Sequence, residues 1–314
     1  MAGTINYSVI IPHKNIPQLL VRCLASIPRR PDVQIIVVDD ASDPSVVDFA
    51  HFPGLDDPQV EVVFTKKGRG AGYARNVGLE RAVGKWVVFA DADDYYLDNL
   101  SAMMDRYVDA DTNMVVFKHV KCEEDGRRMP LRYGDILPFT YYFVHGDPAL
   151  LQYYYFVPFG RFIRRRAIGG LRFQEVPYAN DVFFFLRFQT GDTQMYVVNE
   201  AVYAYVRREN SLLTTVHWKN PYTRCRVTLD CVRYLKDVSD VNLNRFKGND
   251  WPLYWWARTF AQNKWAALRL VPGIWRVTGR NLLPVFFRAV WGGLRGGVRK
   301  PGYGRTTTRK ITAQ

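Results

Sequence analysis

Hydrophobic and polar positions in the first 122 residues form short continuous apolar runs that alternate with segments of helical periodicity. Continuous apolar runs are typical of strands buried on both faces, and such strands occur in parallel sheets covered by helices. The pattern therefore predicts an α/β fold with a mostly parallel central sheet flanked by helices. The predicted strands are 7–12, 33–40, 60–65, 85–90 and 114–122, and the predicted helices are 17–27 and 72–83.

The pattern is less regular in the middle of the chain. Aromatic residues are frequent there, and we favour packing in the core over sugar stacking as their role. The features of this part, in order, are an aromatic-rich stretch at 139–162, three arginines at 164–166, a helix at 182–188 that begins after Asp181, and a pair of strands at 195–206.

Carboxylates follow two of the predicted strands where these strands end. Asp39 and Asp40 end the second strand, and Asp91, Asp93 and Asp94 follow the fourth. Because the carboxyl ends of parallel strands meet at one edge of a sheet, these side chains should converge. If extended geometry persists to Asp93, Asp91 and Asp93 point to the same side, about 6 to 7 Å apart. Clustered carboxylates repel one another unless a cation compensates them, so the pattern predicts a divalent-cation site.

Three glycines, Gly68, Gly70 and Gly72, lie between the third strand and the helix that follows it. This is the context of a dinucleotide-binding turn, but Arg75 replaces the third glycine of the G-x-G-x-x-G pattern. A phosphate group held near the helix N-terminus by backbone N–H groups and Arg75 fits the residues better. An ordinary surface turn with a solvated arginine is the remaining alternative.

Composition and charge indicate a globular chain with an uneven charge distribution. Hydrophobic residues make up 48% of the 314 positions, which suffices for a large core. From residue 219 onward there are 19 Lys and Arg against 4 Asp and Glu, whereas residues 1–218 carry 24 against 26. The entire basic excess of +13 therefore lies in the C-terminal part. The change in charge predicts two regions, at 1–218 and at 219–314, of which the second is helical and basic.

This C-terminal region contains six of the eight tryptophans and has no acidic residue after Asp250. Such a composition favours attachment of residues 251–314 to an anionic membrane surface over binding to nucleic acid. A solvated helical subdomain packed by its tryptophans is an equally strong alternative. A single helix would place four arginines in an arc of about 100°, although Pro284 and two Gly-Gly pairs oppose it. These arginines are Arg280, Arg288, Arg295 and Arg299.

The sequence shows neither a signal peptide at its start nor an apolar run of 18 residues that would cross a membrane. The four cysteines form no C-x-x-C pair and no zinc-type spacing, so we expect reduced, buried thiols. These features predict a cytoplasmic protein, either free or bound peripherally to the cytoplasmic face of the inner membrane. The cysteines are Cys23, Cys122, Cys225 and Cys231.

Five short motifs occur in order between residues 6 and 216. They are Ser8-Val9-Ile10-Ile11-Pro12, Val37-Val38-Asp39-Asp40-Ala41-Ser42, Ala74-Arg75-Asn76-Val77-Gly78-Leu79, Phe89-Ala90-Asp91-Ala92-Asp93-Asp94 and Asn180-Asp181-Val182-Phe183-Phe184. In this order and spacing the motifs resemble those of family 2 glycosyltransferases of the GT-A fold, which is Rossmann-like. The resemblance implies an inverting transfer of a sugar from a nucleoside-diphosphate donor to a hydroxyl group. The implied acceptor is a glycan or a lipid-linked oligosaccharide in bacterial surface polysaccharide synthesis.

The resemblance implies that residues 1–218 are a catalytic domain, with a nucleotide-binding part at about 1–125 and an acceptor part at about 126–218. It also implies roles for the donor-binding residues. Asp40 would accept a hydrogen bond from the imide N–H of the nucleobase, while Asp39 and Pro12 would shape the nucleoside pocket. Arg75 would contact the diphosphate. The expected donor is a UDP-sugar, although His13 stands where many relatives carry an aromatic residue that stacks on the base.

The carboxylates after the fourth strand correspond to the DXD element of the family. Asp91 and Asp93 would form it, and Asp93 would bind Mg²⁺ or Mn²⁺ directly. The cation would neutralise charge that develops on the departing nucleoside diphosphate.

Asp181 corresponds to the general base, which removes the proton of the acceptor hydroxyl during an inverting attack. A purely structural role as a helix cap is the alternative. Arg207, Arg208 and Ser211 match a basic segment that closes over the diphosphate, and an exposed strand end is almost as strong an interpretation. Two other classes remain as alternatives, an NAD-dependent oxidoreductase and a nucleic-acid-binding protein, but nucleic acid is not the expected partner. Processive synthesis is not expected, because the sequence has no Gln-x-x-Arg-Trp element.

Overall fold

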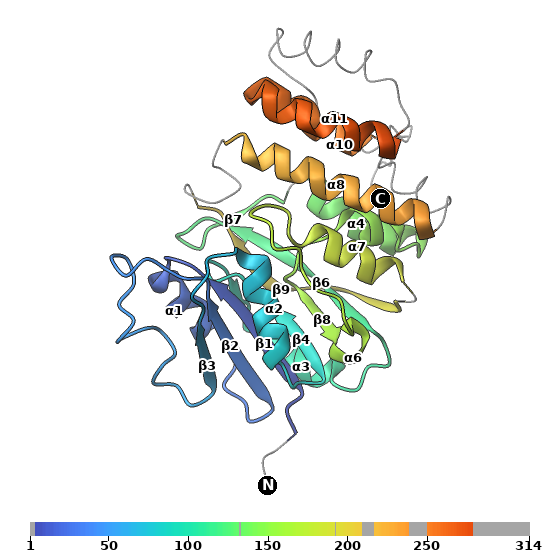
Figure 1. Ribbon diagram of the computed structural model, residues 1–314. Helices are drawn as coiled ribbons and strands as arrows, with labels where there is room; N and C mark the ends of the chain where they lie inside the picture. The colour runs from blue at the N-terminus through green and yellow to red at the C-terminus, as the bar shows by residue number, and fades with distance from the viewer. Residues whose placement is uncertain (1–3, 132, 192, 209–216, 239–249, 279–314) are drawn as a thin grey trace. The chain divides into compact units, whose positions relative to one another are not determined.

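The structure of the protein is a computed structural model (Figure 1). The contacts within the chain divide it into two compact units, Met1–Thr215 and Val216–Gln314. The assignment of a nucleotide-binding part at 1–125 and an acceptor part at 126–218 stays a prediction. The structure describes residues 4–131, 133–191, 193–208, 217–238 and 250–278.

The first four long strands form the parallel half of a sheet, as the sequence predicts. They lie in the order β3-β2-β1-β4, and all three pairs are parallel. Val9 of β1 packs with Leu20 of α1 and Met104 of α3 on one face. Ile10 faces α2 on the other, where a Cβ on Gly78 would lie 2.3 Å from its Cγ2. A strand covered on both faces requires a continuous apolar run. These elements are β1 (Tyr7–His13), α1 (Pro17–Ala25), β2 (Val33–Asp39), β3 (Val60–Phe64), α2 (Ala71–Arg81), β4 (Trp86–Phe89) and α3 (Leu100–Tyr107).

The remaining strands make the rest of the sheet mixed rather than parallel. β8 lies antiparallel between β4 and β6, β9 is parallel to β6, β5 pairs antiparallel with β9, and β7 pairs with β6. The predicted pair of strands at 195–206 is wrong, because one continuous strand covers this range. Its register against β6 shifts near Lys118, as at a β-bulge. The strands are β5 (Tyr95–Tyr96), β6 (Met114–Cys122), β7 (Arg128–Met129), β8 (Arg161–Arg164) and β9 (Met195–Val206).

The aromatic-rich stretch forms two helices and packs largely inside the unit, as predicted. Phe139, Tyr153, Tyr155 and Phe156 are buried, whereas Phe143 is exposed. All four cysteines of the chain are free and buried, as expected. The helices of this part are α4 (Tyr133–His145), α5 (Ala149–Tyr154), α6 (Arg165–Ile168) and α7 (Val182–Thr190).

The described part of the second unit is helical, which confirms the predicted helical extension. Its helices are α8 (Lys219–Val238), α10 (Asp250–Gln262) and α11 (Lys264–Thr278), and each contacts the other two. No helix among the described residues is both long and apolar enough to cross a membrane. The predicted arginine arc at 280–299 lies outside the described residues.

Candidate active site

The acidic segment after β4 is a turn and not an extension of the strand. β4 ends at Phe89, and the N–H of Asp94 donates to the carbonyl of Asp91 at 3.0 Å. Extended geometry therefore ends before Asp93. The alternation of side chains along a strand, on which the prediction for Asp91 and Asp93 depended, does not reach Asp93. The turn, rather than the strand, directs these two carboxylates.

The buried side chain of Asp94 holds this turn in place. The sequence alone assigns no role to this residue. Its carboxylate is 1% exposed and accepts hydrogen bonds from the Tyr203 hydroxyl at 2.9 Å and the Val206 N–H at 2.7 Å. The Tyr203 hydroxyl in turn accepts the N–H of Asp91 at 2.9 Å. Burial raises the pKa of Asp94 well above its ordinary value, and the negative charges of Asp93 and Asp91 raise it further. No motif in the sequence singles out Tyr203.

Arg75 connects the acidic turn to the segment that carries Asp181. Its guanidinium is buried and donates to Asp91 at 2.6 Å and to the side-chain oxygen of Asn180 at 2.8 Å. Burial raises the pKa of Asp91, Arg75 opposes this effect, and Asp93 and Asp181 add to it. Asp181 thus acts electrostatically on Asp91, although the two lie 90 positions apart in the sequence. Residues of two separate motifs meet here through Arg75.

Asp181 occupies the N-cap position of α7 but does not cap it through its side chain. Its backbone carbonyl accepts the N–H of Phe185 at 3.0 Å, whereas the carboxylate makes no capping hydrogen bond to the first turn, all of which is described. The alternative role of Asp181, a purely structural helix cap, would require a hydrogen bond from its carboxylate to the first turn, and this bond is not formed.

Asp93 is partly exposed, as is Asp91, and two arginines contact it. Its side chain pairs with Arg208 at 2.6 Å, and its backbone carbonyl accepts a hydrogen bond from Arg22 of α1 at 2.6 Å. The structure thus pairs Arg208 with Asp93, and the predicted contact of Arg208 with a diphosphate stays a prediction. Arg22 was not predicted, since its helical spacing gives it no distinguishing signal.

Arg207 lies elsewhere, with its side chain 57% exposed and 3.7 Å from Glu123. A contact between Arg207 and the donor stays a prediction, and Ser211 lies outside the described residues.

Asp39 and Asp40 hold loops at the carboxyl end of β2. Asp39 accepts hydrogen bonds from His13 at 2.8 Å and from the N–H and hydroxyl of Ser42 at 2.9 and 2.5 Å. Burial alone raises the pKa of Asp39, but these hydrogen bonds outweigh it and lower the pKa. His13 therefore helps to hold the loop after β2 through its hydrogen bond to Asp39. Pro12 is buried in β1 beside Val38 of β2.

The Asp40 carboxylate accepts the N–H groups of Arg69 and Gly70 at 2.9 and 2.8 Å, and Lys14 lies 3.5 Å away. These contacts link β2 to the glycine-containing loop. The predicted contact between Asp40 and the nucleobase stays a prediction.

The glycines before α2 are explained by backbone geometry. Gly70 has a φ of 94°, which favours glycine, and a Cβ on Gly72 would lie 2.2 Å from the carbonyl oxygen of Gln174. Gly72 thus permits α2 to pack closely against the segment that leads to Asp181. Close packing, rather than a dinucleotide, accounts for this glycine.

The described residues contain no cluster of three or more His, Cys, Asp and Glu side chains that would bind a metal ion alone. Asp91 and Asp93 nevertheless supply two carboxylates, and Mg²⁺ at nucleotide sites commonly uses one or two carboxylates together with substrate phosphates and water. These residues therefore fit an ion that binds together with a diphosphate.

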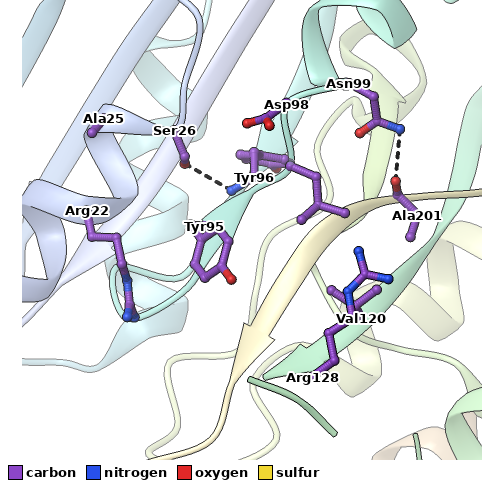
Figure 2. Close-up of a pocket in the computed structure, with 11 residues that line it drawn as sticks. Arg22, Ala25, Ser26, Tyr95, Tyr96, Asp98, Asn99, Val120, Arg128 and Ala201 are labelled. Atoms are coloured by element: carbon purple, nitrogen blue, oxygen red, sulfur yellow. Dashed lines mark hydrogen bonds between the residues drawn. The ribbon is translucent and has the colours of Figure 1, made fainter. Parts of the chain in front are cut away.

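A pocket of about 680 Å³ lies next to the acidic turn and is shown in Figure 2. Arg22, Tyr95 and Arg128 line it. Burial and the hydrogen bond to Cys122 raise the pKa of Tyr95, and the charges of both arginines oppose this rise. None of the residues predicted to bind the donor or catalyse transfer lines this pocket. Its size alone thus does not make it the active site.

Two solved structures share the fold of this chain. A crystal structure of residues 1–349 of TarS from S. aureus in complex with UDP-GlcNAc has a TM-score of 0.61 at 20% identity, covering 91% of this chain and 82% of that one. The mannosyltransferase PcManGT from Pyrobaculum calidifontis in complex with GDP-Man and Mn²⁺ has a TM-score of 0.52 at 18% identity, covering 93% and 81%. These likenesses confirm the predicted GT-A fold.

Sequence comparison agrees with the structural comparison. Glycosyltransferase GlyG of Streptococcus pneumoniae serotype 4 is 23% identical over 248 residues, which are 74% of this chain and 82% of GlyG. The succinoglycan biosynthesis protein ExoO of Rhizobium meliloti is 33% identical over 98 residues, 31% of this chain and 28% of ExoO. The family model described as glycosyl transferase family 2 matches residues 8–171, more than half of the chain. The chain therefore belongs to glycosyl transferase family 2.

Proposed function

We propose that this protein transfers a sugar, with inversion, from a nucleoside-diphosphate donor to a hydroxyl of a glycan or lipid-linked oligosaccharide. The observation that carries the proposal is the link from Asp91 through Arg75 to Asn180, next to Asp181. This link supports a site in which Asp91 would help to bind a cation and Asp181 would act as the base. An NAD-dependent oxidoreductase has no support in the family match, and the third glycine of its motif is replaced.

The diphosphate is proposed to bind between Asp91 and Asp93 of the turn and the arginines Arg75 and Arg208. Mg²⁺ or Mn²⁺, when bound by Asp93 and Asp91, supplies positive charge to the leaving diphosphate. Both arginines already face these carboxylates at 2.6 Å, so the positive charge needed by a diphosphate is in place. Arginine suits this role because its planar guanidinium donates two parallel hydrogen bonds to phosphate oxygens.

Asp181 is proposed to accept the proton of the acceptor hydroxyl as that oxygen attacks the anomeric carbon. An inverting reaction needs the base on the face of the sugar opposite the leaving diphosphate. The acidic turn follows β4, whereas Asp181 stands at the start of helix α7, and the donor is proposed to bind between them. The electrostatic effect of Asp181 on Asp91 supports their proximity.

The donor is proposed to be a UDP-sugar, with Asp40 accepting from the base and with Asp39, Pro12 and Arg207 around the nucleotide. UDP-GlcNAc and GDP-Man are bound in the two solved neighbours, so a guanosine donor is the comparison to test. The relation to ExoO supports a setting in bacterial surface polysaccharide synthesis. The predicted cytoplasmic location belongs to this proposal as well.

A thermal-shift panel tests the proposal with UDP, GDP, dTDP, CMP and NAD, each with and without Mn²⁺. Stabilisation by one nucleoside diphosphate that depends on Mn²⁺ is the expected result, because a ligand that binds only the folded state raises Tm. The nucleotide that stabilises the protein identifies the donor base. Stabilisation by NAD without metal, or by no nucleotide, would overturn the proposal.

A further inference from the structure

Helix α11 presents an apolar strip on its outer side. Trp265 is 78% exposed, Trp275 is 66% exposed and Leu268 is 48% exposed, and Pro272 is exposed as well. At about 100° per residue these four positions lie within an arc of about 80°. The exposure is therefore a continuous strip and not a set of scattered side chains.

The opposite side of α11 is the one that packs within the second unit. Its buried residues are Ala266, Ala267, Leu270, Ile274 and Val277. The carbonyl of Ala267 accepts a hydrogen bond from Trp256 of α10 at 2.9 Å, and the carbonyl of Val277 accepts one from Lys236 of α8. Packing within the second unit thus uses Trp256, which is 1% exposed, and leaves Trp265 and Trp275 at the surface.

Basic residues border the apolar strip, and acidic residues are absent from this stretch of the sequence. On a helical projection Arg269 and Arg276 lie next to Trp265, Lys264 lies beside Trp275 at the other edge, and all three are exposed. The sequence has no Asp or Glu after Asp250. Tryptophans prefer the interfacial zone of a bilayer, and each adjacent Lys or Arg adds attraction to anionic headgroups.

We propose that the α11 strip, formed by Trp265, Leu268, Pro272 and Trp275, inserts into the interface of an anionic membrane with Arg269 and Arg276 on the headgroups. Exposed aromatic side chains, flanking positive charge and missing acidic residues match a lipid surface in both polarity and charge. Nucleic acid would use the same charges but gains nothing from Leu268 and Pro272. The proposal names the helix and face within the region predicted from sequence, and it does not depend on the identity of the donor.

Flotation of the full chain with vesicles tests this surface. Binding to vesicles of phosphatidylcholine with phosphatidylglycerol should be strong at low salt and weaker at high salt, and vesicles of phosphatidylcholine alone should bind little. The double variant Trp265→Ala/Trp275→Ala should bind at least tenfold more weakly, and Arg269→Gln/Arg276→Gln should lose the preference for phosphatidylglycerol. Lipids with brominated acyl chains should quench tryptophan fluorescence in the wild type but much less in the tryptophan variant.

Tyr196→Ala is the matched control, because Tyr196 is an aromatic residue that is 56% exposed on β9 of the first unit. It should bind vesicles like the wild type. Unchanged circular dichroism and thermal unfolding of all variants would show that folding is intact. Equal vesicle binding by the wild type and the double tryptophan variant would overturn the proposal. It would also be overturned if light scattering showed a dimer that only this variant dissociates, or if the variants lost binding to RNA instead of vesicles.

Discussion

The Tyr203 hydroxyl donates to the buried carboxylate of Asp94 at 2.9 Å, and this contact ties β9 to the acidic turn. The same hydroxyl accepts the N–H of Asp91 at 2.9 Å. One phenol group therefore satisfies a buried carboxylate and fixes the backbone of the first DXD residue. Tyr203 contacts the proposed donor site through the backbone N–H of Asp91, so we regard it as a positioning residue.

Replacing Tyr203 by Phe should weaken both stability and turnover. The variant leaves Asp94 short of one donor and the Asp91 N–H without its acceptor, and each unsatisfied buried group costs about 1–3 kcal/mol. We expect a loss of about 2 kcal/mol in the free energy of unfolding in urea, together with a lower kcat and a weaker dependence of activity on Mn²⁺.

Tyr96→Phe is the control for this variant. Tyr96 is buried and donates to the carbonyl of Phe89 at 2.7 Å, but no described hydrogen bond joins its hydroxyl to the turn. It should lose stability and retain kcat. Equal losses of kcat in the two variants would show that Tyr203 has no specific effect on the acidic turn.

Asp181→Asn should abolish transfer and leave donor binding intact. Removal of a general base typically lowers the rate by about 10² to 10⁴-fold. Asparagine has nearly the same shape as aspartate and occupies the N-cap position of a helix equally well, so the free energy of unfolding should change by less than about 0.5 kcal/mol. Isothermal titration of the donor nucleotide, transfer assays and urea unfolding measure the three quantities. Retained turnover in Asp181→Asn would contradict the role of general base. Asp181→Ala tests the cap, because alanine cannot cap a helix, and a loss of about 1 kcal/mol there would identify Asp181 as a helix cap.

Arg208→Gln should change metal binding and diphosphate binding in opposite directions. Arg208 pairs with Asp93 at 2.6 Å, so without nucleotide it competes with a cation for this carboxylate. The variant should bind Mn²⁺ more tightly alone but bind the nucleoside diphosphate with Mn²⁺ more weakly, by about tenfold for one lost charged hydrogen bond. Arg207→Gln is the control, since Arg207 is 57% exposed and pairs with Glu123. Identical behaviour of the two variants would contradict the role of Arg208.

Sequence reasoning located the parallel half of the sheet because each of its strands is covered on both faces and is continuously apolar. β8 and β5 were not predicted, since strands of 4 and 2 residues are too short to show a recognisable pattern. The acidic segment was identified correctly, but its shape was not. A turn through Ala92 and Asp93 depends on Tyr203 and Val206, which lie more than 100 positions away in the sequence.

In the candidate site, too, the sequence predicts individual residues but not the contacts between their side chains. Arg75 and Asp181 could be named from their motifs, whereas the contact that joins them runs through Asn180 and appears only when the chain is folded. Arg22 contacts Asp93 from a helix whose spacing looks ordinary. Residues that bind directly belong to local motifs, but residues that hold them in position are selected by the tertiary structure.

Asp39 should make stability depend on pH in the acidic range. Its hydrogen bonds to His13 and Ser42 lower its pKa below the ordinary value of 3.8, despite burial. The ionised form therefore stabilises the fold above the ordinary value, and this contribution disappears as the pH falls through the lowered pKa. Asp39→Asn cannot ionise, so its deficit in the free energy of unfolding should shrink from about pH 6 to about pH 3. A deficit that stays constant over this range in urea unfolding would rule out the ionised form as the source.

Gly72→Ala should destabilise the protein although alanine favours helices. A Cβ at this position would lie 2.2 Å from the backbone carbonyl oxygen of Gln174 and 3.0 Å from the Cβ of Asn180. The backbone must shift, and overpacking of this kind costs about 1–3 kcal/mol, against a gain in helix propensity of about 1 kcal/mol. The shift also moves Asn180 away from Arg75, so kcat should fall together with the free energy of unfolding. Gly170→Ala, where a Cβ meets nothing within 4 Å, should change neither quantity, and equal effects in urea unfolding and transfer assays would refute the close-packing role of Gly72.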